Sequence, residues 1–321
     1  MKAKEKNDEI LIGISYCLLG AKVRYDGQDK LDRYIKATVG QFVRFVPVCP
    51  EVDIGLGVPR EPIRLEKAGN EVYLVATKSR RDLTSKMRRY SRGKSRELSR
   101  LGIAGYILKK NSPSCGMARV KVYGRNGSPS ATGTGVFADL LMTLQPLLPV
   151  EEEDRLNDPK VRKNFFARVF AYRRLQECFS GRWSVGKLAN FHAAEKYLLL
   201  AHDAKANGAL GRLVARNKTY SRSELARSYQ EGFMTALAKP VTRRGHVNVL
   251  QHMAGFFKES LNKDEKAELQ QLISDYRNGL VPLIVPTTLI RHYIRRYHLD
   301  NLAGQSYLEL HSKELMLQNQ V

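Results

Sequence analysis

Short apolar segments alternate with longer amphipathic ones in the first half of the chain. Residues 10–17, 42–48 and 103–108 are apolar runs rich in β-branched side chains, each about as long as a buried strand. Helix-like stretches lie between them, at 30–40 and 80–101. This alternation is typical of parallel strands joined by crossover helices, so we expect an α/β fold here.

From residue 160 onward, the apolar positions follow a helical period instead. The first helix is expected over 161–178, where one broad apolar face contains Val161, Phe165, Phe166, Val169, Phe170 and Leu175. Further helices are expected at 184–206, 208–217, 221–238, 243–260, 263–278 and 286–298. Because no segment in this region has the pattern of a strand, an all-α domain is predicted.

A change of domain is expected between these two regions. A loop rich in Gly and Ser is predicted at 124–135 and a helix at 136–146, followed by an acidic stretch with prolines at 147–160. A chain of 321 residues is long enough for two cores. We therefore predict an α/β N-terminal domain over residues 1–150, with a mostly parallel sheet flanked by helices, and an all-α C-terminal domain over residues 151–321.

Hydrophobicity and the N-terminus indicate where the protein works. The hydrophobic content of 43% is that of a globular protein, and no apolar run approaches the roughly 20 residues that span a bilayer. The N-terminus is charged ahead of a short apolar run that leads to Cys17 instead of a cleavage site, so no signal peptide is expected. We expect a cytoplasmic protein, in which disulfides are rare.

The charge balance points to a polyanionic partner. The chain has 54 Lys and Arg residues and 32 Asp and Glu residues, a net charge of +22. Residues 1–150 contain 27 basic and 14 acidic residues, and residues 151–321 contain 27 and 18, so the excess is not confined to a tail. A folded protein this basic is expected to bind nucleic acid through phosphate contacts, and a merely solvated basic surface is the alternative.

Three of the four cysteines follow predicted strands. Cys17 ends the first strand, Cys49 follows the second, and Cys115 lies after a short loop that follows the third. Because the carboxyl ends of parallel strands meet at one edge of a sheet, where ligands bind, we expect these thiols to share one site. Cys178, in the helical region, is expected to be a buried core thiol, with a fourth ligand as the alternative.

Three thiols at one sheet edge indicate a metal or cluster site. Structural zinc sites usually have a fourth protein ligand and close Cys-x-x-Cys pairs, whereas these cysteines are 32 and 66 positions apart. Well-separated cysteines suit a 4Fe-4S cluster with one iron free of protein ligands. Such an iron is a Lewis acid and a soft site, well matched to sulfur.

Short motifs around these cysteines resemble those of a known family. The segments SYCLLG at 15–20, VCPEV at 48–52 and NSPSCG at 111–116 are similar to the three signature motifs of the thiouracil desulfidase (TudS-like) family. The resemblance covers roughly residues 9–150 and is strengthened by VRYDG at 23–27 and GLG at 55–57. Residues 160–300 resemble a helical domain of formerly unknown function that is found fused to it, through FHAAEK at 191–196 and HVNVLQH at 246–252.

The resemblance implies a function and a cofactor. The fused form resembles the tRNA 4-thiouridine desulfidases of the RudS type, which implies conversion of 4-thiouridine to uridine with release of hydrogen sulfide. It implies a 4Fe-4S cluster on Cys17, Cys49 and Cys115, with the substrate sulfur bound to the open iron, and a helical domain that helps to hold tRNA. No membrane or protein partner is expected. The alternatives are a desulfidase of free thiouracil or thiouridine, and a non-catalytic iron–sulfur protein that binds or senses RNA.

Three polar residues are the expected catalytic groups of a hydrolytic reaction. Glu51 lies two residues after Cys49 and is expected to activate water as a general base, with capping of the following helix or turn as the alternative. Ser112 and Ser114 are expected to bind uracil oxygens or the tetrahedral intermediate, with a serine-stabilised turn as the alternative.

Five further residues are candidates for substrate binding. Tyr16 and Tyr25 are expected either to stack on the pyrimidine or to pack in the core. Lys110 and Asn111 are candidates for contacts with the base or a phosphate. Asp26, in a Tyr-Asp-Gly sequence, is most simply a turn residue and is a secondary candidate.

Clustered arginines mark the expected nucleic-acid contacts. The segment 78–100 has ten basic and two acidic residues, which favours phosphate contacts over a solvated helix face. Its named candidates are Arg80, Arg81, Lys86, Arg88, Arg89, Arg92 and Arg96. In the helical region the candidates, interleaved with aromatics as suits unstacked bases, are Arg243, Arg244, Arg291, Arg295 and Arg296. The histidines there lack the His-x-x-x-His spacing of zinc sites, so we expect His192, His202, His246 and His252 to form structural hydrogen bonds.

Overall fold

The computed structural model describes residues 9–124, 127–299 and 301–308. These residues form two compact units, which meet in the chain between Arg173 and Arg174. The predicted division at residue 150 is earlier. The difference arises because the first half of the following helix buries Phe165, Phe166 and Val169 in the core of the first unit.

A four-stranded parallel sheet forms the centre of the first unit. Its strands are β1 (Leu11–Ser15), β2 (Arg44–Val48), β5 (Gly105–Leu108) and β8 (Val150–Glu152), in the order β2-β1-β5-β8. All three pairings are parallel. The strands expected around residues 10–17, 42–48 and 103–108 and the α/β class are therefore confirmed.

A second four-stranded sheet was not anticipated from the sequence. It consists of β3 (Ile63–Ala68), β4 (Glu71–Ala76), β6 (Val120–Tyr123) and β7 (Pro129–Gly133), in the order β4-β3-β6-β7. The expectation that 124–135 is only a loop was wrong, because β7 pairs antiparallel with β6. Strand β3 forms a hairpin with β4 and pairs in parallel with β6.

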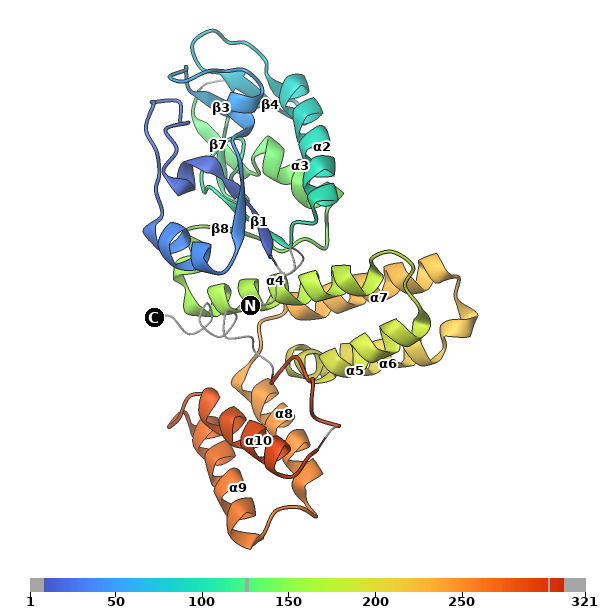
Figure 1. Cartoon of the computed structure of the whole chain (residues 1–321). Helices are drawn as coiled ribbons and strands as arrows, with labels where there is room; N and C mark the ends of the chain where they lie inside the picture. Colours follow the sequence, from blue (N-terminus) through green and yellow to red (C-terminus); the bar gives the residue numbers. More distant parts are fainter. Residues whose placement is uncertain (1–8, 125–126, 300, 309–321) are drawn as a thin grey trace, which may run out of the picture. The chain divides into compact units, whose positions relative to one another are not determined.

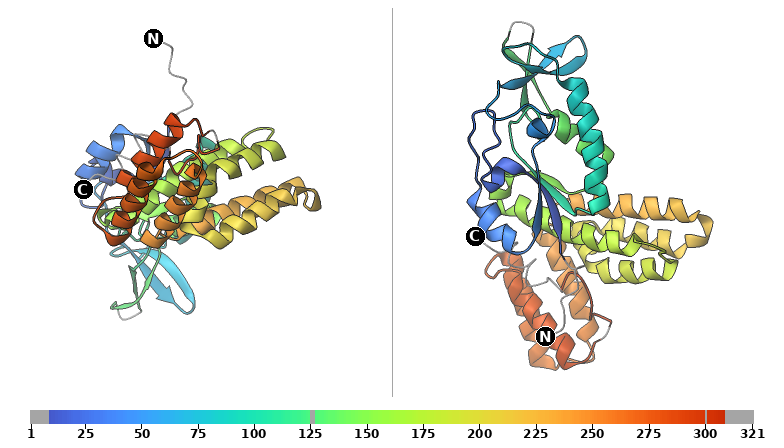
Figure 2. Two further views of the ribbon diagram at one scale, coloured as in Figure 1. Left: turned by 90° about the horizontal axis from the view of Figure 1, so that it is seen from below. Right: turned by 45° about the horizontal axis from the view of Figure 1, so that its top comes forward.

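Two apolar clusters cover the two faces of the parallel sheet. On one face, Tyr106 and Leu108 pack with α2 (Thr84–Leu101) and α3 (Val136–Leu144), which lie side by side in Figures 1 and 2. On the other face, Ile107 packs with the single π-helical turn Tyr34–Thr38 and the start of α4 (Pro159–Phe179). Neighbouring side chains of β5 thus point to opposite cores, as the pleat of a strand requires.

Helix α2 shows why the basic segment of the sequence folds as it does. Its buried positions, Thr84, Met87, Ser91, Ser95 and Leu98, recur every three or four residues and form one stripe. The Arg residues between them are exposed. The helix therefore uses a narrow face for packing and presents its charges to solvent.

The second unit is helical. It contains the end of α4, α5 (Val185–His202), α6 (Ala204–Ala215), α7 (Arg222–Ala238), α8 (Arg243–Ala254), α9 (Lys263–Asn278) and α10 (Ile284–Arg296). Five of these helices begin with a side chain that accepts a backbone N–H bond of the first turn, from Ser184, Asp203, Ser221, Thr242 and Asn262. The predicted all-α character is confirmed. No helix within the described ranges is both long and apolar enough to cross a membrane.

Candidate active site

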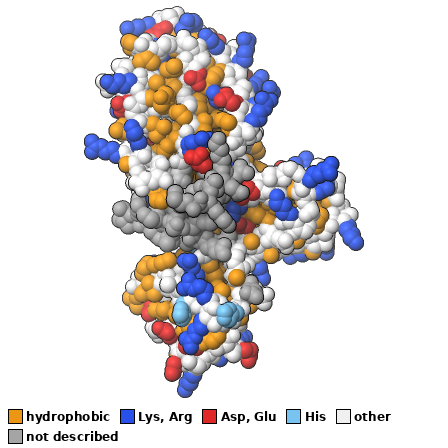
Figure 3. Space-filling view, in the orientation of Figure 1, with side chains coloured by type: hydrophobic (Ala, Val, Ile, Leu, Met, Phe, Trp, Pro, Cys, Tyr) orange, Lys and Arg blue, Asp and Glu red, His pale blue; other side chains and the backbone are white. Residues whose placement is uncertain are grey.

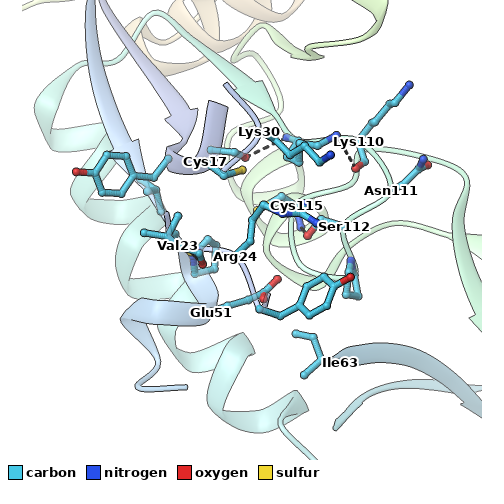
Figure 4. Close-up of a pocket in the computed structure, with 18 of the residues that line it drawn as sticks. Cys17, Val23, Arg24, Lys30, Glu51, Ile63, Lys110, Asn111, Ser112 and Cys115 are labelled. Atoms are coloured by element: carbon cyan, nitrogen blue, oxygen red, sulfur yellow. Dashed lines mark hydrogen bonds between the residues drawn. The ribbon is translucent and has the colours of Figure 1, made fainter. Parts of the chain in front are cut away.

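The carboxyl ends of β1, β2 and β5 open into one cavity of about 410 Å³. Its lining includes Cys17, Cys49 and Cys115. In Figure 4, Cys115 and Ser112 lie near the centre of the view, Lys30 lies near Cys17, and Lys110 and Asn111 lie to the right. The expectation that three strand ends bring the three thiols to one place therefore agrees with the structure.

Each cysteine is held by the turn that follows its strand. Cys17 lies in the 3-10 helix η1 (Tyr16–Leu19), and its carbonyl accepts the N–H groups of Gly20 and Lys30 at 3.2 and 3.0 Å. Cys49 is the N-cap residue of the short helix α1 (Pro50–Asp53), where Pro50 supplies the fixed φ of a first helical position. Both thiols are half-buried.

The start of α3 fixes the loop of Cys115. The carbonyls of Pro113 and Ser114 accept N–H bonds from Val136 and Phe137 at 3.1 and 3.0 Å. A Cβ at Gly135 would lie only 2.5 Å from the backbone carbon of Ser114, so this close approach requires glycine. Cys115 is consequently a buried thiol in a rigid loop, only 6% exposed.

Burial keeps the three thiols neutral when no metal is bound. It raises the pKa of Cys17 to about 11, with the neighbouring Cys49 as the second cause. Burial also raises the pKa of Cys49, and it raises that of Cys115 well above the ordinary range. Because thiolates are the metal-binding form, occupation of the site must release protons.

Glu51 is the acidic residue of the cavity, and it is held from two sides. Its Oε2 accepts bonds from Arg60 Nε and Nη2 at 3.1 and 2.6 Å. Its Oε1 accepts a bond from the hydroxyl of Ser114 at 3.0 Å. Glu51 lies in the first turn of α1, and its side-chain partners fix its carboxylate beside Cys49 and the Cys115 loop.

Arg60 is a site residue that the sequence analysis missed. Its side chain is only 5% exposed and also donates to the carbonyls of Val23 and Gly57, at 3.0 and 2.9 Å. Arg60 thus ties together three segments around Glu51. Its sole sequence signal is its position in VPREP, between two prolines just after the glycine-rich run at 55–57, which does not identify a partner.

The two serines predicted to be catalytic have different local roles. Ser112 Oγ accepts the N–H groups of Ser114 and Cys115 at 3.2 and 3.1 Å, which is the serine-stabilised turn considered as the alternative. The Ser112 side chain still lines the cavity. Ser114 is fully buried, and its hydroxyl donates to Glu51.

Four of the five predicted substrate-binding residues line the cavity. Tyr16 and Tyr25 are 41% and 43% exposed, which contradicts the alternative of core packing. Lys110 and Asn111 also line it; Lys110 Nζ is 2.6 Å from Asp154, and Asn111 has a left-handed backbone with φ 59°. Asp26 is not part of the lining.

Asp26 is a turn residue, which was the simplest role expected for it. Its carboxylate accepts bonds from Arg24 at 3.2 and 3.0 Å and from the backbone N–H of Gln28 at 3.1 Å. These bonds lower its pKa, chiefly through Arg24. The same guanidinium lies 5.4 Å from the ring centre of Tyr25, so Asp26 acts on the cavity through the placement of Arg24.

Cys178, His192, His202 and His246 belong to the second unit and have structural contacts, whereas His252 is exposed. Cys178 is buried, with its Sγ 3.9 Å from the carbonyl of Lys187. His192 Nδ1 lies 3.1 Å from the Tyr229 hydroxyl, and His246 Nδ1 lies 2.8 Å from that of Tyr307. His202 Nδ1 lies 2.6 Å from a carbonyl oxygen, that of Lys239.

Most of the predicted phosphate-binding residues of the first unit are exposed on α2. Arg88, Arg89, Arg92 and Arg96 line a shallow groove of about 560 Å³. Figure 3 shows Lys and Arg side chains gathered on the α2 side of this unit. Lys86 and Arg81 are also exposed.

Arg80 differs from the residues of α2. Its two Nη atoms bind both carboxylate oxygens of Glu66, at 2.5 and 2.6 Å, so it braces the β3–β4 hairpin. In the second unit, Arg244 and Arg295 are exposed and Arg291 is half-buried. Arg243 lies over the ring of Tyr276 at 5.8 Å, and Arg296 pairs with Glu265 at 2.8 Å.

The donor set of the cavity fits an iron–sulfur cluster. Three cysteine thiols line one cavity, and cysteine ligation is the usual mode for such clusters. In the part of the chain that the structure describes, no three His, Cys, Asp or Glu side chains are grouped so as to hold a single metal ion.

Comparisons with known proteins match the two halves of the chain separately. Residues 12–153 match the family model "2-thiouracil desulfurase", and residues 196–312 match "Protein of unknown function (DUF1722)". The uncharacterized protein YbbK of Bacillus subtilis is 33% identical over 156 residues, which is 46% of this chain and 99% of that protein. The uncharacterized protein YbgA of Escherichia coli is 31% identical over 153 residues, which is 47% of this chain and 90% of that protein.

One solved structure is also similar. It is described as a [4Fe-4S]-dependent thiouracil desulfidase, TudS, with 35% sequence identity, a TM-score of 0.38, and coverage of 47% of this chain and 94% of that one. The matched residues 12–153 contain all three cysteines and Glu51. Through this first unit, the chain belongs to the 2-thiouracil desulfurase family.

Proposed function

We propose that this protein is a 4Fe-4S-dependent desulfidase that converts 4-thiouridine in tRNA to uridine and releases hydrogen sulfide. The observation that carries the proposal is one cavity that is lined by Cys17, Cys49, Cys115 and a fixed carboxylate, that of Glu51. The solved relative described as a [4Fe-4S]-dependent thiouracil desulfidase supports the chemistry.

In this proposal the three cysteines hold the cluster, and other side chains handle the substrate. When bound, the cluster supplies a Lewis acid toward the sulfur of the substrate. The exposed rings of Tyr16 and Tyr25 are placed to stack on a pyrimidine at the mouth of the cavity. Lys110 and Asn111 provide polar groups for the base or its phosphate.

Glu51 has the geometry of a general base. A carboxylate oxygen has two lone pairs, and Oε1 uses one of them for the Ser114 hydroxyl, so a site for a water molecule remains. Arg60 holds Oε2 and thereby fixes the direction of Oε1. Glu51 takes a proton from a water molecule while the oxygen of that water bonds to the thiocarbonyl carbon. The net reaction consumes one water and exchanges the C=S bond for C=O, with hydrogen sulfide as the second product.

The preference for tRNA rests on charge. The net charge is +22, and exposed arginines form a continuous groove on α2 of the catalytic unit. Phosphate contacts of this kind provide most of the affinity for nucleic acid. A free base carries no phosphate and would gain little from such a surface.

The test is a comparison of substrates with anaerobically reconstituted protein. Sulfide release is measured from 2-thiouracil, from 4-thiouridine and from tRNA that contains 4-thiouridine, and kcat/KM is compared. The proposal expects the highest value for tRNA. Strong tRNA binding without sulfide release from any substrate would contradict an enzyme and favour an RNA sensor.

Desulfidation of free thiouracil is the second candidate. It is favoured by the name of the solved relative, which matches the first unit alone. In the same assay, this candidate predicts equal or faster release from 2-thiouracil than from tRNA.

A further inference from the structure

A groove of about 420 Å³ lies between α6 and α7 in the second unit, and none of its lining residues has a role assigned above. Ligand sites for small organic groups have volumes of about 300 to 1,000 Å³. The floor of the groove is apolar and small, formed by Ala206, Ala209, Leu210, Leu213 and Gly232. Such a floor suits a flat ring.

The two helices are packed closely enough to hold this groove in shape. They lie side by side in Figures 1 and 2. A Cβ at Gly232 would lie 2.9 Å from Leu210 Cδ2, so a larger residue at this position of α7 would displace the Leu210 side chain of α6. Leu210 is itself buried. The groove is therefore a built feature of the helix pair.

Arg212 and Arg216 provide positive charge along the groove. Both are exposed, and within the described ranges neither guanidinium forms an ion pair with an acidic side chain. The nearest acidic residue of α7 along the chain, Glu224, instead accepts the N–H of Ser221 at 2.9 Å. Arg216 caps the C-terminus of α6, where a cation also interacts favourably with the helix dipole.

Tyr220 completes the groove with an aromatic ring that is 42% exposed. Its backbone is fixed on both sides. The 3-10 turn Asn217–Thr219 precedes it, and the capping box of Ser221 and Glu224 follows it. An exposed aromatic ring with a fixed backbone, next to two free arginines, is the arrangement that proteins use for unpaired nucleotides. The helix dipole accounts for a cation at the C-terminus of α6, but not for the exposed ring of Tyr220 or for the groove.

We propose that the α6–α7 groove binds one unpaired nucleotide of the RNA substrate, with the base stacked on Tyr220 and adjacent phosphates at Arg212 and Arg216. This site rests on the proposed function, because it assumes an RNA substrate. It adds a contact to single-stranded RNA that does not involve the catalytic unit. An acidic peptide would bind the two arginines but would not stack on the Tyr220 ring. The effect of replacing Tyr220 on binding therefore distinguishes RNA from an acidic peptide.

Equilibrium binding of tRNA to the full-length holoprotein tests the site at several salt concentrations. Tyr220→Leu is expected to weaken binding about tenfold without changing the slope of log K against log salt, because stacking releases no counterions. The double variant Arg212→Gln, Arg216→Gln is expected to weaken binding and reduce that slope by about 0.7 for each lost phosphate contact. Tyr220→Trp keeps an aromatic ring and should bind tRNA as tightly as wild type. This result would show that Tyr220→Leu binds weakly because stacking is lost and not because the protein is misfolded.

Control variants and a second assay show whether a negative result contradicts the groove or the proposed function. Arg277→Gln removes an exposed arginine of α9, outside the groove, and should leave tRNA binding within about twofold of wild type. All variants should release sulfide from free 4-thiouridine at the wild-type rate. Binding by Tyr220→Leu equal to wild type would overturn the groove and leave the desulfidase proposal standing. Wild-type protein that bound no tRNA would overturn both the groove and the tRNA substrate.

Discussion

The Arg60 guanidinium donates two hydrogen bonds, from Nε at 3.1 Å and Nη2 at 2.6 Å, to one oxygen of the Glu51 carboxylate. This pair is nearly buried, with 5% and 13% of the two side chains exposed. Because Ser114 holds the other oxygen, rotation of the carboxylate is blocked. Glu51 is thus preorganised beside the three thiols, as a group that acts on water should be.

Replacement of Glu51 by Gln is expected to abolish most of the reaction while leaving the cofactor in place. Glutamine keeps the shape and can still accept from Arg60, but it cannot take a proton from water. General base catalysis contributes roughly 100- to 10,000-fold, so kcat should fall by that factor. The iron content and visible absorption of the variant should match wild type. A wild-type kcat would show that another group activates the water.

Substitution of Arg60 separates positioning from stability. Lysine keeps the charge but not the two-bond geometry, so Arg60→Lys should lower kcat about tenfold with little change in KM. Arg60→Met removes both hydrogen bonds to Glu51 Oε2 and the Arg60 bonds to the carbonyls of Val23 and Gly57. It should cost about 3 kcal/mol in the free energy of unfolding, measured by urea denaturation. Equal stability of the Lys and Met variants would contradict this role.

Removal of single cysteines should distinguish the cavity thiols from the core thiol. Cys17→Ala, Cys49→Ala and Cys115→Ala each remove one of the three thiols of the cavity, and each variant should lose its cluster and its sulfide release. Cys178→Ala serves as the matched control, because Cys178 lies in the second unit against Lys187. It should keep wild-type iron per chain after anaerobic reconstitution. If Cys178→Ala lost its iron while the three cavity variants kept theirs, the assignment of the cluster to Cys17, Cys49 and Cys115 would be wrong.

Local sequence pattern was enough to locate the cysteines but not the second sheet. Each thiol follows an apolar run, and parallel strands bring their ends together whatever the details of their pairing. The β3–β4 hairpin did carry a signal, since Gly69 and Asn70 separate two alternating segments. The pairing of β3 with β6 had no local sequence signal, because it joins Leu65 to Val122, which are 57 positions apart in the chain.

The same limit explains why Arg60 was missed and Ser114 was given a different role. A hydrogen bond between side chains 9 or 63 positions apart depends on the course of the whole backbone. Sequence spacing showed that Glu51 lies two residues after Cys49, but not which groups would orient its carboxylate. Arg80 is a further example, because its charge suggested phosphate while its geometry assigns it to Glu66.

This difference between arginines leads to a prediction about tRNA affinity. The double variant Arg92→Gln, Arg96→Gln removes two exposed arginines of the α2 groove. It should weaken tRNA binding and lower the slope of log K against log salt by about one per lost phosphate contact. Arg80→Gln should leave affinity and slope unchanged but destabilise the hairpin, because Glu66 loses its two bonds from Arg80 and keeps that from Arg64. A lower slope for Arg80→Gln would show that this residue also contacts phosphate.

His192 should make the stability of the second unit depend on pH. Burial lowers its pKa below the ordinary value of 6.5, with Lys196 as the second cause, and its Nδ1 lies 3.1 Å from the Tyr229 hydroxyl. The unfolded chain therefore binds a proton more readily than the folded one, so the contribution of His192 is complete above pH 6.5 and declines as the pH falls toward the folded pKa. Carboxylates with lowered pKa values, such as Asp203 and Glu265, cause losses only at lower pH.

Urea denaturation between pH 7.5 and 5 tests this dependence, followed by the fluorescence of Trp183. This residue is the single tryptophan of the chain, and its ring packs against Phe179 in the second unit. The free energy of unfolding should fall with pH in wild type. In His192→Gln, which keeps a polar group near Tyr229 but does not titrate, the curve should be flatter over this range. Parallel curves for the two proteins would assign the pH dependence to other groups.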